Sequence, residues 1–78
     1  MKTSDLTYLT GTMTADEASF YSAPGWYWRI VYKPGSRIAR TIWQGPHKEA
    51  KGARSAAKRH TKGVTSQSVS HIEMCERS

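Results

Sequence analysis

The run from Trp26 to Lys33 constrains the fold most, because six of its eight residues are aromatic or β-branched and none is Gly or Pro. This composition predicts a β-strand, in which side chains alternate between the two faces. The more apolar face would carry Trp26, Trp28, Ile30 and Tyr32. The opposite face would carry Tyr27, Arg29, Val31 and Lys33. We expect Trp28 to lie in the core beneath a helix and Tyr27 to be exposed.

A hairpin and a helix are expected after this strand. The Pro-Gly pair at 34–35 suits the centre of a type II turn, so residues 37–43 are predicted to return as the second strand. The Gly-Pro pair at 45–46 predicts the start of a helix, because Pro is tolerated at the first helical position. That helix would run to about His60, and Gly63 is suited to the residue that follows a helix end.

Residues 69–75 alternate in polarity and predict a further strand, which we place at an edge of the sheet because it contains Ser and Glu. The order strand, strand, helix, strand indicates the α+β class, with a small antiparallel sheet and one principal helix packed on it. At 78 residues the chain is expected to form a single domain, residues 1–78.

The N-terminal segment, residues 1–24, is less regular than the rest. Residues 5–10 are compatible with either a short strand or an ordered arm. Thr14 and Glu17 have the spacing of a capping box, which predicts a short helical turn through Phe20. Such a turn would place Phe20 and Tyr21 against the body of the domain. The strand-strand-helix-strand unit then occupies residues 25–78.

Basic residues gather in the predicted helix. Half of the twelve Lys and Arg residues fall between Lys48 and Lys62, and residues 23–63 hold ten of them against a single acid, Glu49. At about 100° per residue the six cations fill an arc of roughly 140° on one side. The small residues Ala50, Ala53, Ala56 and Ala57 lie opposite. A solvated helix face normally mixes both signs of charge, so this composition favours a surface that meets a polyanion.

The hairpin offers a second set of candidate contacts, since Arg can recognise guanine edges and exposed aromatic rings can stack on bases. We therefore predict a binding surface formed by the hairpin and the helix together. Its residues are Tyr27, Arg29, Lys33, Arg37, Arg40, Lys48, Lys51, Arg54, Lys58, Arg59 and Lys62. Sequence-independent affinity would come from phosphate neutralisation by the helix.

Other function classes find little support. His71 and Cys75 would share a strand face, but one Cys and no close ligand pair argue against zinc. No nucleophile elbow or Gly-rich phosphate loop is present, so we expect no enzyme, no cofactor and no small-molecule substrate. No apolar run is long enough for a membrane span, and the N-terminus lacks a signal-peptide core, which predicts a cytoplasmic protein.

The strand at 25–32, the turn at 34–35, the return at 37–43 and the helix opening at 47–51 together resemble the arm-type DNA-binding domain of phage tyrosine recombinases. The resemblance implies a sheet that enters the major groove, with Tyr27, Arg29, Arg37 and Arg40 facing DNA. The added strand after the helix is equally similar to small phage inhibitors of host RNA polymerase or CRISPR complexes. The expected partner is therefore nucleic acid, DNA in the first place, or an acidic surface of a host nucleic-acid-handling complex, as for an anti-CRISPR protein.

Overall fold

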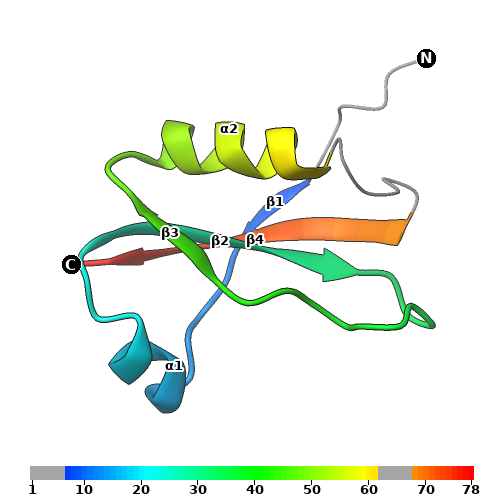
Figure 1. Cartoon of the computed structure of the whole chain (residues 1–78), viewed down its shortest axis with the longest axis horizontal. Coiled ribbons are helices and arrows are strands. Elements are labelled where there is room, and N and C mark those ends of the chain that lie inside the picture. Colours follow the sequence, from blue (N-terminus) through cyan, green and yellow to red (C-terminus); the bar gives the residue numbers. More distant parts are fainter. Residues whose placement is uncertain (1–6, 62–67) are drawn as a thin grey trace.

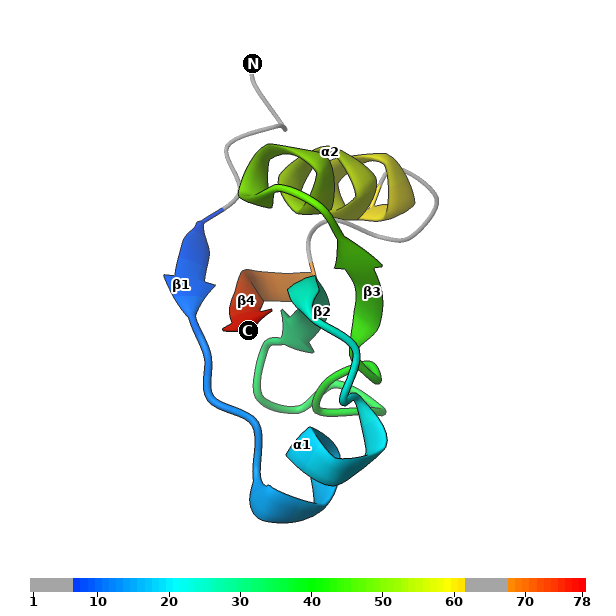
Figure 2. The same cartoon turned by 90° about the vertical axis from the view of Figure 1, so that its left-hand side faces the viewer.

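A four-stranded sheet between two helices forms the protein in the computed structural model, which describes residues 7–61 and 68–78. The elements are β1 (Tyr8–Thr10), α1 (Ala15–Phe20), β2 (Gly25–Tyr32), β3 (Gln44–His47), α2 (Ala50–Thr61) and β4 (Val69–Arg77). The principal helix α2 covers one face of the sheet, and α1 lies on the other (Figures 1 and 2). The α+β class with one principal helix packed on a small sheet is confirmed.

The sheet has the strand order β1-β4-β2-β3 and is mixed rather than wholly antiparallel. β1 runs parallel to β4, whereas the β4–β2 and β2–β3 pairs are antiparallel. The strand predicted at 69–75 is present, but its placement at an edge was wrong, because the N-terminal segment pairs with its outer side. Ile72 N donates to Thr7 O at 2.8 Å, and Gly11 N donates to Met74 O at 2.7 Å.

The core beneath α2 follows the predicted alternation of β2. Trp28 and Ile30 face α2, and Ile30 pairs across the sheet with Ile72. Ala53 and Ala57 of α2 are fully buried on the same side. Because an alanine face is small, the helix lies close to the sheet and the larger aromatic side chains fill the space between them. The placement of Trp28 in the core beneath the helix is confirmed.

The opposite face of β2 is also buried, which the sequence did not indicate. Tyr27, Met13 and Trp43 form a second cluster there, with Tyr21 packed against it. The capping box that begins α1 is confirmed: Thr14 N donates to a Glu17 carboxylate oxygen at 3.0 Å, and Glu17 N donates to Thr14 Oγ1 at 3.2 Å.

Phe20, the last residue of α1, and Tyr21, which follows it, have different environments. Tyr21 packs edge-on against Tyr27, with ring centroids 5.6 Å apart. Phe20 contacts the ring of Tyr21 but is 78% exposed, so its predicted packing against the body of the domain was wrong. Arg77 of β4 donates to the carbonyl oxygens of Tyr21 and Ala18, and so satisfies acceptors at the C-terminal end of α1.

The return from β2 differs from the predicted hairpin. The Pro-Gly turn is present, closed by Ser36 N donating to Lys33 O at 3.1 Å. Residues 37–43 do not form a strand, however, and only Arg40 bridges to Val31 of β2. The antiparallel partner strand of β2 is β3 instead, and its register shifts between the pairs formed by Trp26 and Trp28.

The Gly-Pro pair at 45–46 lies inside β3 and does not begin the helix, which starts at Ala50. Its peptide bond is cis, and Gly45 has a φ of 136°. A Cβ at Gly45 would lie 2.7 Å from the carbonyl oxygen of Trp26, so only glycine allows the two strands to approach this closely. The helix ends at Thr61, close to the predicted His60, while Gly63 lies outside the described residues. Within the described ranges no helix is long and apolar enough to cross a membrane.

Candidate nucleic-acid interface

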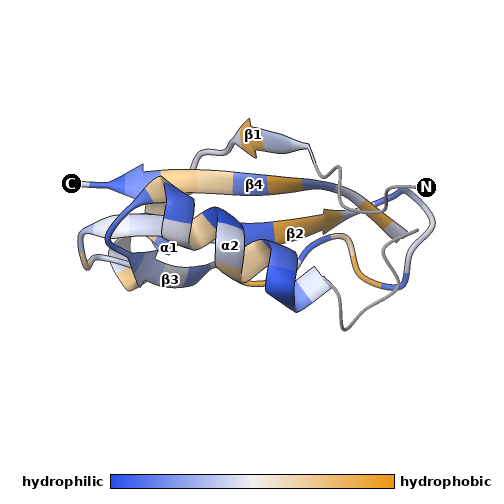
Figure 3. Ribbon diagram, turned by 90° about the horizontal axis from the view of Figure 1, so that it is seen from above, coloured by the Kyte–Doolittle hydropathy of each residue, from blue (hydrophilic) through white to orange (hydrophobic). Residues whose placement is uncertain are grey.

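Five basic residues are exposed on and immediately before α2, and we call them the α2 basic surface: Lys48, Lys51, Arg54, Lys58 and Arg59. The sixth predicted cation, Lys62, lies outside the described residues. Figure 3 looks down on α2, where hydrophilic residues recur along the helix above the more hydrophobic strands β2 and β4. Among residues 7–61 and 68–78, none of the five forms an ion pair. These five side chains present positive charge to solvent, and the acidic residue next to Lys48, Glu49, is exposed as well.

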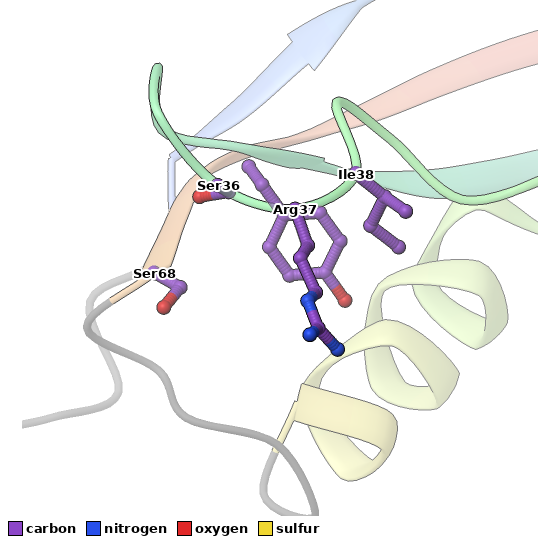
Figure 4. A pocket seen from close by; sticks show the side chains of 5 residues that line it. Ser36, Arg37, Ile38 and Ser68 are labelled. Atoms are coloured by element: carbon purple, nitrogen blue, oxygen red, sulfur yellow. The ribbon is translucent and has the colours of Figure 1, made fainter.

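The predicted hairpin cations do not all join this surface. Lys33, Arg37 and Arg40 are exposed. Arg40 bridges to Val31, and paired residues share a sheet face, so it belongs to the face covered by α1. Arg37 lies on the other side: its side chain extends toward the last turn of α2 (Figure 4). It lines a cavity of about 250 Å³. The other described residues that line this cavity are Tyr32, Ser36, Ile38 and Ser68.

Tyr27 and Arg29 do not lie on a free face, so the expectation that this face of β2 is exposed was wrong. Tyr27 is 2% exposed, and its hydroxyl donates to Ala23 O at 2.8 Å. Arg29 is 8% exposed; Nε donates to a Glu73 carboxylate oxygen at 2.6 Å, and Nη1 lies 3.3 Å from a Glu17 carboxylate oxygen. Both are covered because the N-terminal segment folds across this face.

Glu17 shows the electrostatic effect of this packing. The hydrogen bond from Thr14 N lowers the pKa of the Glu17 carboxyl below its ordinary value, and the charges of Arg29 and Arg40 act in the same direction. Arg29 is therefore held by two carboxylates, and Arg40 lies near one of them. Neither belongs to the α2 basic surface.

Two hollows flank α2, and sequence reasoning missed both. The first lies on the β3 side, has a volume of about 380 Å³, and is lined by Trp28, His47, Ala56, Arg59 and His60. The second, of about 180 Å³, lies on the β1 side and is lined by Tyr8, Leu9, Thr10, Trp26, Ala50, Arg54 and Met74. Each combines aromatic rings with one arginine of the α2 basic surface. Burial raises the pKa of the Tyr8 hydroxyl, and the charge of Arg54 partly opposes this.

The β3-side hollow, lined by the five residues named above, has its rings in a defined arrangement. Trp28 Nε1 donates to His47 Nε2 at 3.3 Å, and the rings of Trp28 and His60 lie 5.5 Å apart at 58°. An indole nitrogen only donates, so His47 accepts at Nε2 and carries its proton at Nδ1. His47 and His60 stand at the two ends of the basic stretch, a position that could have marked them as candidates.

No metal centre is formed by the described part of the chain, where no three His, Cys, Asp or Glu side chains gather. His71 Nε2 lies 3.9 Å from a Glu73 carboxylate oxygen. Cys75, which would share its strand face, is half-buried against the cluster of Met13, Tyr27 and Trp43. The two side chains thus contact different groups.

The resemblance to recombinase arm-binding domains implied that Tyr27, Arg29, Arg37 and Arg40 face DNA, and of these Tyr27 and Arg29 are buried. The exposed cations of α2 remain as the candidate interface. Comparison of the chain with protein-family models, with curated proteins and with solved structures gave no match.

Proposed function

We propose that the protein is a non-enzymatic module that binds nucleic acid, DNA in the first place, through the α2 basic surface. The observation that carries the proposal is the contrast between two sets of cations. Arg29 and Arg77 are bound by carboxylates and carbonyl oxygens, whereas the five cations of the α2 basic surface are exposed and form no ion pair with any described residue. Cations without an ion-pair partner attract a polyanion, and the counterions of that polyanion are released when the cations neutralise its phosphates.

The spacing of these cations suits a phosphate backbone. The four basic residues within α2, from Lys51 to Arg59, span about 12 Å along the helix at 1.5 Å per residue, and Lys48 lies just before the helix. One strand of B-form DNA carries about four phosphates over 12 Å, at 3.4 Å per phosphate. A helix lying along the backbone would therefore pair its four cations with a similar number of phosphates, and Lys48 is available for one more. Such contacts position the protein and carry no sequence information.

A role in a phage or mobile element is also proposed, and it is supported by the sequence resemblance alone. The alternative partner, an acidic surface of a host nucleic-acid-handling complex, would use the same cations. A binding experiment distinguishes the two partners. Only the nucleic-acid proposal predicts that the protein binds a purified oligonucleotide when no other protein is present.

The test is fluorescence anisotropy with a labelled 20-nucleotide strand and with its duplex, at salt concentrations from 50 to 200 mM. If five phosphates are neutralised, the log–log salt slope for duplex should be about −4.5, a several-hundred-fold loss over this range. The variant Lys51→Gln/Lys58→Gln should bring the slope to about −2.7. Lys33→Gln/Arg40→Gln removes the same charge outside α2 and serves as the matched control.

Two results would contradict the proposal. One is no binding to either oligonucleotide at 50 mM salt, which would favour the protein partner. The other is an equal loss of affinity in both double variants, which would show that net charge, and not the α2 basic surface, attracts the nucleic acid.

A further inference from the structure

We propose that the β3-side hollow holds one unpaired base, so that the α2 basic surface binds single-stranded nucleic acid in preference to duplex. The inference rests on the proposed function and names the class of nucleic acid that is bound. Among the described residues that line this hollow, Trp28, His47 and His60 carry aromatic rings. Arg59, which also lines it, belongs to the α2 basic surface.

The hollow is a shallow depression of about 380 Å³ that opens widely to solvent and is not an enclosed pocket. An open surface of this kind suits a flat ring that stacks by one face. Trp28 is 4% exposed and forms the interior wall, whereas His60 is exposed at the outside. A base entering from solvent would therefore meet the imidazole of His60 first. Planar side chains of this kind stack on unpaired bases without regard to their sequence.

The hollow offers two polar groups to a bound nucleotide, the imidazole of His47 and the guanidinium of Arg59. The hydrogen bond from Trp28 Nε1 occupies His47 Nε2, so the ring is fixed and its remaining nitrogen, Nδ1, is a donor. Nδ1 lies 3.9 Å from the place that a Cβ on Gly52 would take, so no side chain at position 52 covers it. Base edges present carbonyl oxygens that accept from such donors. Arg59 is placed to bind the phosphate next to the base.

The other two cavities suit a base less well. The cavity at Arg37 has a single aromatic ring, Tyr32, among its described lining residues. The β1-side hollow is smaller, about 180 Å³, and aliphatic Leu9 and Met74 contribute to its lining. Among the described residues that line these two cavities, no ring is held by a hydrogen bond to a second ring. A duplex keeps its bases stacked inside, so only an unpaired base can enter any of the three.

The experiment compares three probes of equal length: a mixed-sequence single strand, an abasic strand with the same phosphates, and a duplex. The wild-type protein should bind the single strand about 5- to 150-fold more tightly than the abasic strand, the range expected for one stacked base. His60→Ala should remove this difference, while its affinity for the abasic strand should stay unchanged. His60→Phe, which keeps a ring and has no charge, should restore it. Ser55→Ala, an exposed change on the same helix, is the matched control.

The outcomes separate the two proposals. Equal wild-type affinity for the single strand and the abasic strand would overturn the base site and leave the proposed function intact. Absence of binding to all three probes would overturn the proposed function itself. Thermal melts identify any variant that fails to fold, and the comparison of base-containing and abasic strands on wild-type protein decides the question without a variant.

Discussion

Arg29 lies against Trp43, with its guanidinium carbon 4.2 Å from the centroid of the indole ring. The same guanidinium contacts Glu17 of α1 and Glu73 of β4. One side chain of β2 thereby joins α1, the central strand β4 and the segment that leads into β3. A charge that the sequence suggested for DNA contact instead connects the layers of the fold.

Replacing Arg29 with Met should destabilise the protein by about 2 to 4 kcal/mol, because two partly buried carboxylates would lose their cation. The free energy of unfolding is measured by urea denaturation at pH 7. Arg40→Met removes a charge from an exposed site on the same face and should change stability by no more than about 0.5 kcal/mol. Similar stability of the two variants would argue against a structural role for Arg29.

Both faces of β2 should be intolerant of truncation, since Tyr27 and Trp28 are each buried. Tyr27→Ala and Trp28→Ala should each cost about 3 to 5 kcal/mol. Tyr27→Phe should cost about 1 kcal/mol, the contribution of the hydroxyl hydrogen bond to Ala23. Thermal melts of the three variants provide the measurement. Wild-type stability of Tyr27→Ala would show that the second core does not form.

Replacement of Gly52 and of Gly45 by alanine should change the free energy of unfolding in opposite directions. Gly52 lies in α2, where a Cβ would make an ordinary contact of 3.8 Å with His47. Gly52→Ala should therefore stabilise the protein by about 0.5 to 1 kcal/mol. Gly45→Ala would place Cβ 2.7 Å from Trp26 O at a φ of 136°, and should cost more than about 1 kcal/mol. Denaturant midpoints that move in the same direction would contradict this pair.

The stability of the folded protein should decrease at acidic pH, because the Glu17 carboxylate becomes protonated there. The pKa of this carboxyl is lowered in the folded state, chiefly by the hydrogen bond from Thr14 N. A group of this kind stabilises the fold at pH values above its unfolded pKa, and this contribution is lost as the pH falls through the folded pKa. Gln at position 17 can still complete the capping box but carries no charge.

The wild-type protein should therefore be more stable than Glu17→Gln at pH 7, and the difference should shrink once the pH falls below the ordinary carboxyl value of 4.5. Melting temperatures of both proteins between pH 3 and 7 provide the check. A difference that stays constant over this range would show that the Glu17 charge does not contribute.

Local patterns in the chain were enough to locate most elements. The aromatic and β-branched run predicted β2, the Thr14–Glu17 spacing predicted the start of α1, and the alanine positions predicted the buried face of α2. These features depend on backbone preference and on periodicity, which neighbouring residues set. For the same reason the exposed cations of α2 could be identified before the structure.

Burial of the second face of β2 could not be predicted in this way. Alternation separates Tyr27 and Arg29 from Trp28, but it does not reveal which distant segment will cover them. Here the cover is α1 together with Trp43, and β1 pairs with β4 and moves that strand to the interior of the sheet. The β3-side hollow likewise exists only where β3 and α2 meet. The sequence alone determined which side chains share a face of a strand or helix. Contacts between remote segments decided which of those faces is exposed, because the free energy of burial depends on what packs against a face.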